Sequence, residues 1–230
     1  MLCAFLLCNA QISDNVKWDY PIKPGMEGWK ERPYHENVEK SQPPKELMNS
    51  WNTETLFAYC LDYPFNLVTW MFDNPYVGFK FVYDQATVWQ EFIRRKDAPD
   101  VLTHYFDNLS FERLFEIKED HFVGHEKLML YFLEKLISET DFTANLDSSS
   151  KRKLVNAVLK THQNKKKYPD QFLAYSYNTS LYALAKILES DPSNDAISLA
   201  KLRETTGYGR SNDENMDATI TASVLNYLNK

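Results

Sequence analysis

Residues 53–72 read TETLFAYCLDYPFNLVTWMF, and the aromatic-rich stretch continues to VLTHYF at residues 101–106. No other part of the chain holds so many large apolar side chains. Because each aromatic ring that folding buries removes about 150–250 Å² from water, we expect this stretch to dominate the core. It carries no catalytic signature, so it predicts a fold rather than a reaction.

Helical spacing is the main pattern within this stretch. Asn52 or Thr53 can cap a helix in which apolar residues recur every three to four positions and so form one face. Tyr63-Pro64 would end this helix. That face consists of Leu56, Phe57, Cys60 and Leu61. The following residues, 65–72, are almost continuously apolar and predict a short buried helix.

The remaining sequence also reads as helices joined by short breaks. Helices are expected over 34–40, 45–49, 76–84, 88–93, 98–106, 121–139, 151–167, 181–190 and 195–205, and a last one through Ile220, Val224, Leu225 and Leu228. Asn74 followed by Pro75 would open the helix over 76–84, residues 147–150 would cap the helix over 151–167, and Asn178 or Thr179 would start the helix over 181–190. The buried face of the helix over 151–167 would be Leu154, Val155, Val158, Leu159 and His162. This pattern predicts an all-α protein of antiparallel helix pairs, stacked as a bundle or as a short HEAT-like, solenoid arc. We expect an irregular segment over 11–43, which is rich in Pro and Gly, and a single helical domain over 44–230.

Composition narrows the functional classes. The chain has 43% apolar and 25% charged residues, which is close to an ordinary globular protein. Only six glycines argues against a turn-rich β-sandwich or barrel. The net charge of −6 gives no reason to expect a nucleic-acid partner. No apolar run reaches the ~18 residues that a transmembrane helix needs.

The N-terminus points to export. Residues 2–10 read LCAFLLCNA, and Cys8-Asn9-Ala10 fits the small-x-small pattern of a signal-peptide cleavage site before Gln11. A basic start and a longer apolar segment are missing, so the alternative is a buried N-terminal strand or helix. Lipidation of Cys8 is disfavoured because Leu7 stands where that signal needs a small residue. We expect residues 1–10 to be a truncated signal peptide of a bacterial protein exported to the periplasm or cell surface.

Cysteine usage agrees with a structural role. Cleavage would remove Cys3 and Cys8 and leave Cys60, so the mature monomer could form no disulfide. Cys60 lies on the apolar face of its predicted helix, where a small hydrophobic side chain fits. We therefore interpret Cys60 as buried filler rather than as a nucleophile, which would need an exposed, electropositive site.

An ordered series of residues over 29–107 carries a family resemblance. The series is Trp29-Lys30, Gln42-Pro43-Pro44, Leu47-Met48, Thr53-x-x-Leu56, Cys60-Leu61-x-Tyr63-Pro64, Gly78-Phe79, Phe92, Arg95-Lys96-Asp97-Ala98 and Leu102-x-x-Tyr105. It resembles a group of uncharacterised exported bacterial proteins that have an all-helical domain of stacked hairpins. Where many relatives have Met-Ser/Thr-Thr before the helix, this chain has Met48-Asn49-Ser50-Trp51-Asn52-Thr53. The resemblance implies a fold and export, and it implies no reaction.

Two features could carry chemistry. His121 and His125 are four residues apart, so on a helix they share a face as a metal-binding pair must, with His104, Glu119 or Asp120 as a further ligand. The pair lacks the Glu after the first His that defines the zincin motif, and Gly124 weakens the helix. Two surface or capping histidines are the alternative, and we expect no metal and no cofactor.

The second feature is a basic helix. Lys153, Lys160 and Lys167 recur every seven residues and form a stripe that could bind phosphates, anionic glycans or a membrane surface. The alternative is an ordinary solvated face, with the last lysines, 165–167, favoured by the helix dipole. Six aromatic residues are expected to be core rather than a surface that stacks on sugars or binds a peptide. They are Trp51, Tyr59, Tyr63, Trp70, Tyr76 and Trp89.

These observations give two functional hypotheses. The first is a non-enzymatic exported helical scaffold that binds a protein or glycan partner. It rests on the helical array, the N-terminal signal and the lack of a GxSxG, phosphate-loop or CxxC motif. The alternative is a metal-dependent hydrolase that uses His121 and His125.

Overall fold

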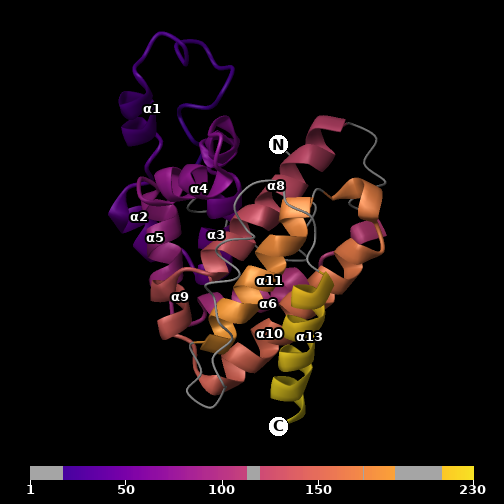
Figure 1. Ribbon diagram of the computed structural model, residues 1–230. Helices are drawn as coiled ribbons and strands as arrows, with labels where there is room; N and C mark the ends of the chain where they lie inside the picture. Colours follow the sequence, from indigo (N-terminus) through magenta and orange to yellow (C-terminus); the bar gives the residue numbers. More distant parts are fainter. Residues whose placement is uncertain (1–17, 113–119, 173, 190–213) are drawn as a thin grey trace. The chain divides into compact units, whose positions relative to one another are not determined.

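The protein is all-helical throughout the residues described by the computed structural model, which are 18–112, 120–172, 174–189 and 214–230 (Figure 1). These residues include no β-strand. The chain forms two compact units, of which the first ends at Val101 and the second begins at Leu102. The boundary falls inside helix α6 (Ala98–Asp107), so the single domain expected over 44–230 stays a prediction.

The described helices of each unit are short to medium in length. The first unit contains α1 (Tyr34–Lys40), α2 (Lys45–Ser50), α3 (Thr53–Leu61), the 3-10 helix η2 (Asn66–Met71), α4 (Pro75–Tyr83) and α5 (Thr87–Arg94). After α6, the second contains α8 (Asp120–Ile137), α9 (Thr140–Ala144), α10 (Ser148–Lys166), the 3-10 helix η3 (Pro169–Gln171), α11 (Ala174–Glu189) and α13 (Glu214–Asn229). The all-α class predicted from spacing is therefore confirmed. None of the described helices is long and apolar enough to cross a membrane.

Helix α3 forms the centre of the first unit, as its sequence predicts. Asn52 caps it, and the Asn52 side chain accepts a hydrogen bond from the Thr55 backbone N–H at 2.7 Å. The apolar face packs against α5, where Phe57 lies against Trp89 and Phe92. Cys60 is fully buried, which confirms its role as core filler and raises the pKa of its thiol.

The segment after α3 differs from the expectation of a buried helix. Residues 66–71 form the 3-10 helix η2, in which the buried side chains are the polar Asn66 and Thr69, whereas Leu67 and Met71 are exposed. The amide of Asn66 explains this inversion. It donates to the carbonyls of Cys60 and Leu61 at the end of α3, and its oxygen accepts from the Trp89 indole N–H at 2.9 Å. The last carbonyls of a helix lack N–H donors from the helix itself, and the Asn66 amide donates to two of these carbonyls.

Helix α4 approaches η2 very closely. Asn74 caps α4 and Pro75 occupies its first turn, as predicted. A Cβ added at Gly78 would lie only 2.0 Å from the Thr69 carbonyl oxygen. Only glycine therefore permits this spacing between the two elements.

The N-terminal segment of the first unit is irregular up to α1, yet it is packed. Tyr20 is 1% exposed, and its hydroxyl donates to the Tyr59 carbonyl at 2.8 Å. The Ser41 hydroxyl donates to the carbonyl of Ile22. The residues from Trp18 to Ser41 thus contribute to the core that α3 organises. Proline and glycine content predicts the irregular backbone but gives no sign of this burial.

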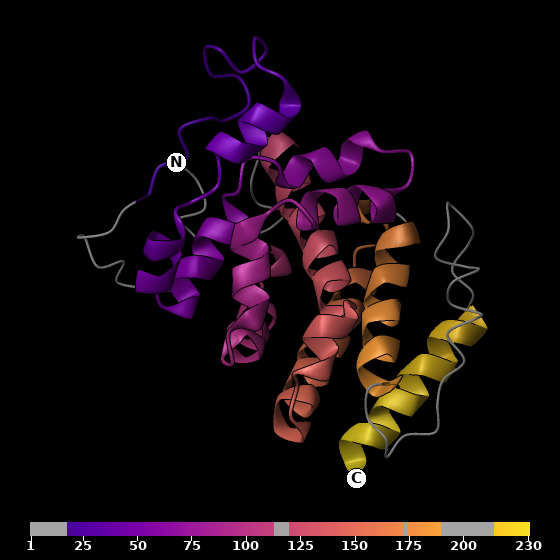
Figure 2. The same cartoon turned by 90° about the vertical axis from the view of Figure 1, so that its left-hand side faces the viewer.

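Helix α11 is central to the second unit. It packs against α8, α9, α10 and α13, and both views show it running alongside α8 (Figure 1, Figure 2). The expected start of this helix near Asn178 or Thr179 is wrong, because α11 begins at Ala174. Thr179 and Ser180 instead face the interior, where they contact a buried carboxylate described below.

Helix α10 has the predicted buried face, but it begins three residues before the expected start at 151 and ends one residue before the expected end at 167. Asp147 caps it by accepting from the Ser150 backbone N–H at 2.7 Å. The predicted apolar face is buried, including His162. In α13, Ile220 and Val224 are buried as expected, but Leu225 is exposed. The signal peptide expected over 1–10 and the helix expected over 195–205 lie outside the described residues.

Candidate functional site

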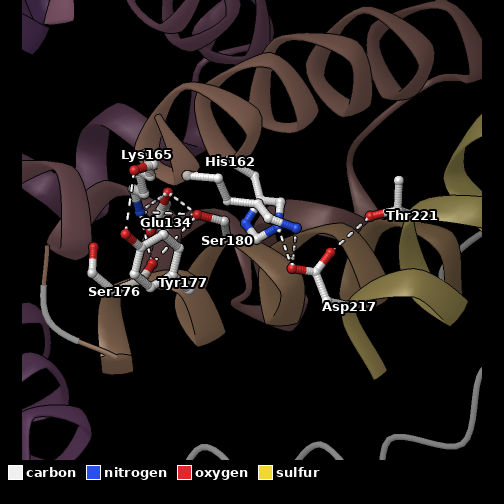
Figure 3. A network of polar contacts seen from close by, with 9 residues as sticks. Glu134, His162, Lys165, Ser176, Tyr177, Ser180, Asp217 and Thr221 are labelled. Carbon is white, nitrogen blue, oxygen red and sulfur yellow. Dashed lines mark hydrogen bonds and ion pairs between the residues drawn. The ribbon is translucent and has the colours of Figure 1, made fainter. Parts of the chain in front are cut away.

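The most unusual feature of the second unit is a buried ion pair. Lys165 of α10 places its Nζ 2.7 Å from Oε1 and 2.8 Å from Oε2 of Glu134 on α8, and neither side chain is exposed (Figure 3). The same Nζ donates to the Ser176 carbonyl at 2.8 Å and to the Ser180 hydroxyl at 2.9 Å. All three protons of the ammonium therefore have acceptors.

The carboxylate is equally well surrounded. Ser180 donates to Oε1 of Glu134 at 2.7 Å, and Thr179 donates to Oε2. Three helices, α8, α10 and α11, thus meet at a single charged pair. Buried charges are tolerated when they are paired and hydrogen-bonded, which is the case here.

The sequence contains a signal for this pair that spacing analysis missed. Glu134 follows Leu130 by four residues and precedes Ile137 by three, so it lies on the apolar face of α8. Lys165 likewise follows Val158 by seven residues on α10. Our interpretation of residues 165–167 as solvated and favoured by the dipole is wrong for Lys165, because this side chain is fully buried.

The arrangement of Lys165 and Ser180 resembles the contact that a general base makes with a nucleophilic hydroxyl. Burial lowers the pKa of the Lys165 ammonium, and the Glu134 carboxylate opposes that shift. A substrate, however, has no exposed atom to reach, since Ser180, Lys165 and Glu134 are all 0% exposed. The network therefore holds helices together, and its geometry offers no site for a reaction.

A second polar cluster, here called the α13 clasp, fastens α13 to α10. It consists of His162, Lys166, Asp217 and Thr221. Figure 3 labels His162, Asp217 and Thr221. Oδ2 of Asp217 lies 3.2 Å from Nε2 of His162 and 2.8 Å from Nζ of Lys166. The Thr221 hydroxyl donates to Oδ1 of the same carboxylate at 3.2 Å.

The environment of the clasp shifts both titratable groups. Burial lowers the pKa of His162 more than the nearby Asp217 raises it, and the charge of Lys165 adds to the lowering. For Asp217, burial alone would raise the pKa, but Lys166 and His162 outweigh it and hold the pKa below its usual value. The folded protein thus favours a carboxylate opposite a neutral imidazole.

The far end of α13 makes further contacts with α10. Arg152 donates to the Leu228 carbonyl at 2.7 Å, and its guanidinium lies 5.3 Å from the centre of the Tyr227 ring. Ile220, Val224 and Tyr227 are buried. Apolar packing therefore holds α13 in place together with two sets of polar contacts. The α13 clasp lies near the start of α13, and the contacts of Arg152 lie near its end.

The predicted metal pair is only partly described. His121 and His125 both belong to α8, as the spacing predicts, but their side chains lie outside the described residues. Within the described residues, no group of three or more His, Cys, Asp or Glu side chains is placed to hold a metal ion. The metal-dependent hydrolase stays an untested hypothesis.

The three lysines of the predicted basic stripe are exposed on α10 and at its C-terminal end. Lys153, Lys160 and Lys167 all face solvent. Lys160 donates to the Asp107 carbonyl at 3.1 Å, and Lys167 donates to the Asn164 side chain at 2.8 Å. These local contacts are typical of a solvated helix face, and binding of anions by the stripe stays a prediction.

An exposed apolar surface lies on η2 and α4 of the first unit. The described residues contain seven exposed large hydrophobic side chains, and five of them belong to these two elements. The five are Leu67, Met71, Tyr76, Val77 and Phe81. We call them the η2–α4 surface. Of the aromatic residues expected in the core, Trp51, Tyr59, Tyr63 and Trp89 are buried, whereas Trp70 is only half-buried and Tyr76 is 43% exposed.

Comparison of the chain with protein families, with curated proteins and with solved structures finds no match. The resemblance over 29–107 to exported helical proteins is therefore still a prediction.

Proposed function

We propose that this protein is a non-enzymatic helical binding module whose η2–α4 surface docks a protein partner. The supporting observation is the clustering of exposed apolar side chains on two adjacent elements. Met71 is 81% exposed and Val77 is 50% exposed. Clustered apolar exposure of this kind often marks an interaction site, whereas isolated exposed residues need no explanation.

The chemistry of the surface favours a protein over a glycan. Leu67, Met71 and Val77 are aliphatic or thioether side chains, which have no flat face for stacking on a sugar ring. Methionine is flexible and polarisable, and binding surfaces often use it to fit apolar partners. A glycan partner, the other possibility raised by the sequence, would need more exposed aromatic rings than Tyr76 and the 37%-exposed Phe81 provide.

The charges around the surface indicate what kind of protein segment would fit. Residues 62–84 contain three acidic residues, Asp62, Asp73 and Asp84, against one basic residue, Lys80. Asp73 and Asp84 are exposed beyond the two ends of α4, and Lys80 already pairs with Asp84 at 3.0 Å. An apolar surface with an acidic margin is complementary to an amphipathic helix that carries flanking lysines or arginines.

The export signal expected at residues 1–10 belongs to the same proposal and rests on sequence alone. With it, the partner would be met in the periplasm or at the surface of a bacterial cell. The binding test that follows does not depend on this location.

Fluorescence anisotropy with two labelled peptides tests the binding surface. One peptide is an amphipathic Leu/Lys helix, and the other has the same leucines with every Lys replaced by Glu. We expect the Leu/Lys peptide to bind, and Met71→Gln or Val77→Gln to weaken binding about fivefold or more, as for side chains that each contribute ~1 kcal/mol. The control is Leu225→Gln on α13, which removes an apolar side chain that is 45% exposed, close to the 50% of Val77.

The second peptide and the acidic margin test the charge argument. The Leu/Glu peptide should bind more weakly, and Asp73→Asn should reduce the preference between the two peptides. Binding that Met71→Gln leaves unchanged would refute the surface. Self-association abolished by Met71→Gln, or oligosaccharide binding abolished by Tyr76→Ala, would replace the proposed partner by a second copy or by a glycan.

A further inference from the structure

His162 lies in the contact between α10 and α13, and its surroundings favour the neutral imidazole. The His162 side chain is 1% exposed, and Nε2 lies 3.2 Å from the Asp217 carboxylate. Nδ1 is also buried, and it has no hydrogen-bond partner among the described residues. A carboxylate accepts hydrogen bonds, so Nε2 carries the proton and Nδ1 carries a lone pair.

Protonation of His162 would disturb this arrangement. The added proton on Nδ1 would be a buried donor without an acceptor among the described residues, which is unfavourable. The positive charge would also be added on the same helix face as Lys165 and Lys166. Asp217 would attract the imidazolium, but Lys166 already shares that carboxylate at 2.8 Å.

The charged groups around His162 come from three helices, and a fourth helix contributes a titratable tyrosine. Lys165 and Lys166 lie on α10, Asp217 on α13 and Glu134 on α8, while α11 contributes the ring of Tyr177 at 6.4 Å. Lys165 and Glu134 pair with each other, and at the imidazole the lowering effect of Lys165 on the pKa exceeds the raising effect of Glu134. The lowered pKa of His162 agrees with the net unfavourable effect of adding a proton here.

From this geometry we propose that α13 is an acid-sensitive cover, whose docking on α10 and α11 weakens when His162 is protonated. The docked state holds neutral His162, whereas the released state exposes the imidazole to water, where it titrates near its ordinary value of 6.5. The docked state therefore has full stability above about pH 6.5 and loses it as the pH falls below that value. Asp217 remains ionised in this range because its pKa is lowered.

Hydrogen exchange on the full chain tests the proposal. The measured quantity is the protection of amides in 214–229 at pH 7.5 and 5.5, after correction for the intrinsic pH dependence of exchange, with amides of 126–137 in α8 as the internal reference. We expect a several-fold loss of protection in α13 at pH 5.5, with about tenfold as the limit for a group titrating near 6.5. Protection in α8 should be unchanged.

Two variants separate His162 from other titrating groups. His162→Gln keeps an N–H donor near the Nε2 position and cannot be protonated, so protection of α13 should become independent of pH. His104→Gln, at an exposed position of α6, should retain the wild-type pH dependence. Equal loss of protection in wild type and His162→Gln would overturn the proposal, as would equal losses in α13 and α8.

If His162→Gln does not fold, a pH titration of the wild-type protein tests whether docking of α13 requires neutral His162. The imidazole of His162, followed by NMR, should titrate below pH 6.5 and together with the amide signals of α13. A midpoint at or above pH 6.5 would show that docking favours the protonated form, and the proposal would then be wrong.

Discussion

Nζ of Lys165 lies 2.7 Å from Oε1 of Glu134, and both side chains are completely shielded from solvent. This contact joins α10 to α8, and hydrogen bonds from Thr179 and Ser180 extend it to α11. A pair of this kind has a predictable asymmetry. Removing one partner strongly destabilises the protein, because the other charge stays buried and unpaired. Removing both partners costs less stability, because the penalty for desolvating the two charges also disappears.

The first prediction concerns this asymmetry. Glu134→Gln or Lys165→Met should each lower the free energy of unfolding by about 3–5 kcal/mol, because each leaves an unpaired buried charge. The double variant Glu134→Leu/Lys165→Met should recover most of that loss. Urea denaturation followed by circular dichroism measures all three values.

The exposed pair of Lys23 with Asp19 provides the control for this experiment. Its N–O distance of 2.6 Å is as short as that of the buried pair, but the Asp19 side chain is 81% exposed. Asp19→Asn should change the free energy of unfolding by at most ~1 kcal/mol. Single variants of the buried pair that behave like Asp19→Asn would show that the charges are hydrated rather than buried.

A second prediction concerns Lys135, which neighbours Glu134 on α8. Burial lowers the pKa of its ammonium from 10.5 to about 8, against the opposing charges of Glu134 and Glu139. The unfolded chain therefore binds more protons between about pH 8 and 10.5, so the free energy of unfolding rises with pH in this window. Relative to Lys135→Met, the wild type should gain about 2 kcal/mol between pH 7 and pH 9.5.

Urea denaturation of both proteins at several pH values measures this gain. The free energy of unfolding of Lys135→Met is subtracted from that of the wild type at each pH. This difference removes the contributions of the tyrosines and other lysines that titrate in the same range. The ammonium lies 4.7 Å from the centre of the Tyr182 ring, and this contact is lost in the variant at every pH at which the amine is charged. A difference that stays constant from pH 7 to 9.5 would show that Lys135 keeps an ordinary pKa.

The third prediction tests the close approach of α4 and η2. Gly78→Ala should destabilise the protein by at least about 1–3 kcal/mol, since the added methyl would overlap the Thr69 carbonyl and force the two elements apart. The comparison variant is Gly25→Ala, where a Cβ meets nothing within 4 Å and only the positive φ of 85° causes strain. Thermal denaturation should show the larger loss for Gly78→Ala, and the reverse order would contradict the tight packing.

The fourth prediction concerns the hydrogen bonds of Asn66. Asn66→Leu should lower the free energy of unfolding by several kcal/mol, at about 1–3 kcal/mol for each buried group left without a partner. The stranded groups are the Trp89 indole N–H and the carbonyl of Leu61, whereas the carbonyl of Cys60 keeps the Tyr63 backbone N–H as a donor at 3.3 Å.

A double-mutant cycle isolates the contact of Asn66 with Trp89. Trp89→Phe removes the indole donor, so Asn66→Leu should cost less in that background than in the wild type. Equal effects in the two backgrounds would show that the contact contributes nothing to stability.

The helices of this protein could largely be predicted from local sequence. Asn52, Asn74 and Asp147 cap α3, α4 and α10 as expected, because capping and helical spacing involve residues within one or two turns of each other. Cys60 and His162 were placed correctly in the core for the same reason, since each lies on the apolar face of its own helix.

The polar clusters could not be predicted in this way. Glu134 and Lys165 are 31 residues apart and His162 and Asp217 are 55 apart, so their pairing depends on how helices pack. The exposed side chains of η2 are a similar case, because Asn66 occupies the interior position only after α3 and α5 have brought their polar groups together. Sequence alone therefore determined the helical class, the caps and much of the apolar core. Tertiary packing decided which charged groups are buried and which apolar groups remain exposed, because both depend on contacts between distant segments.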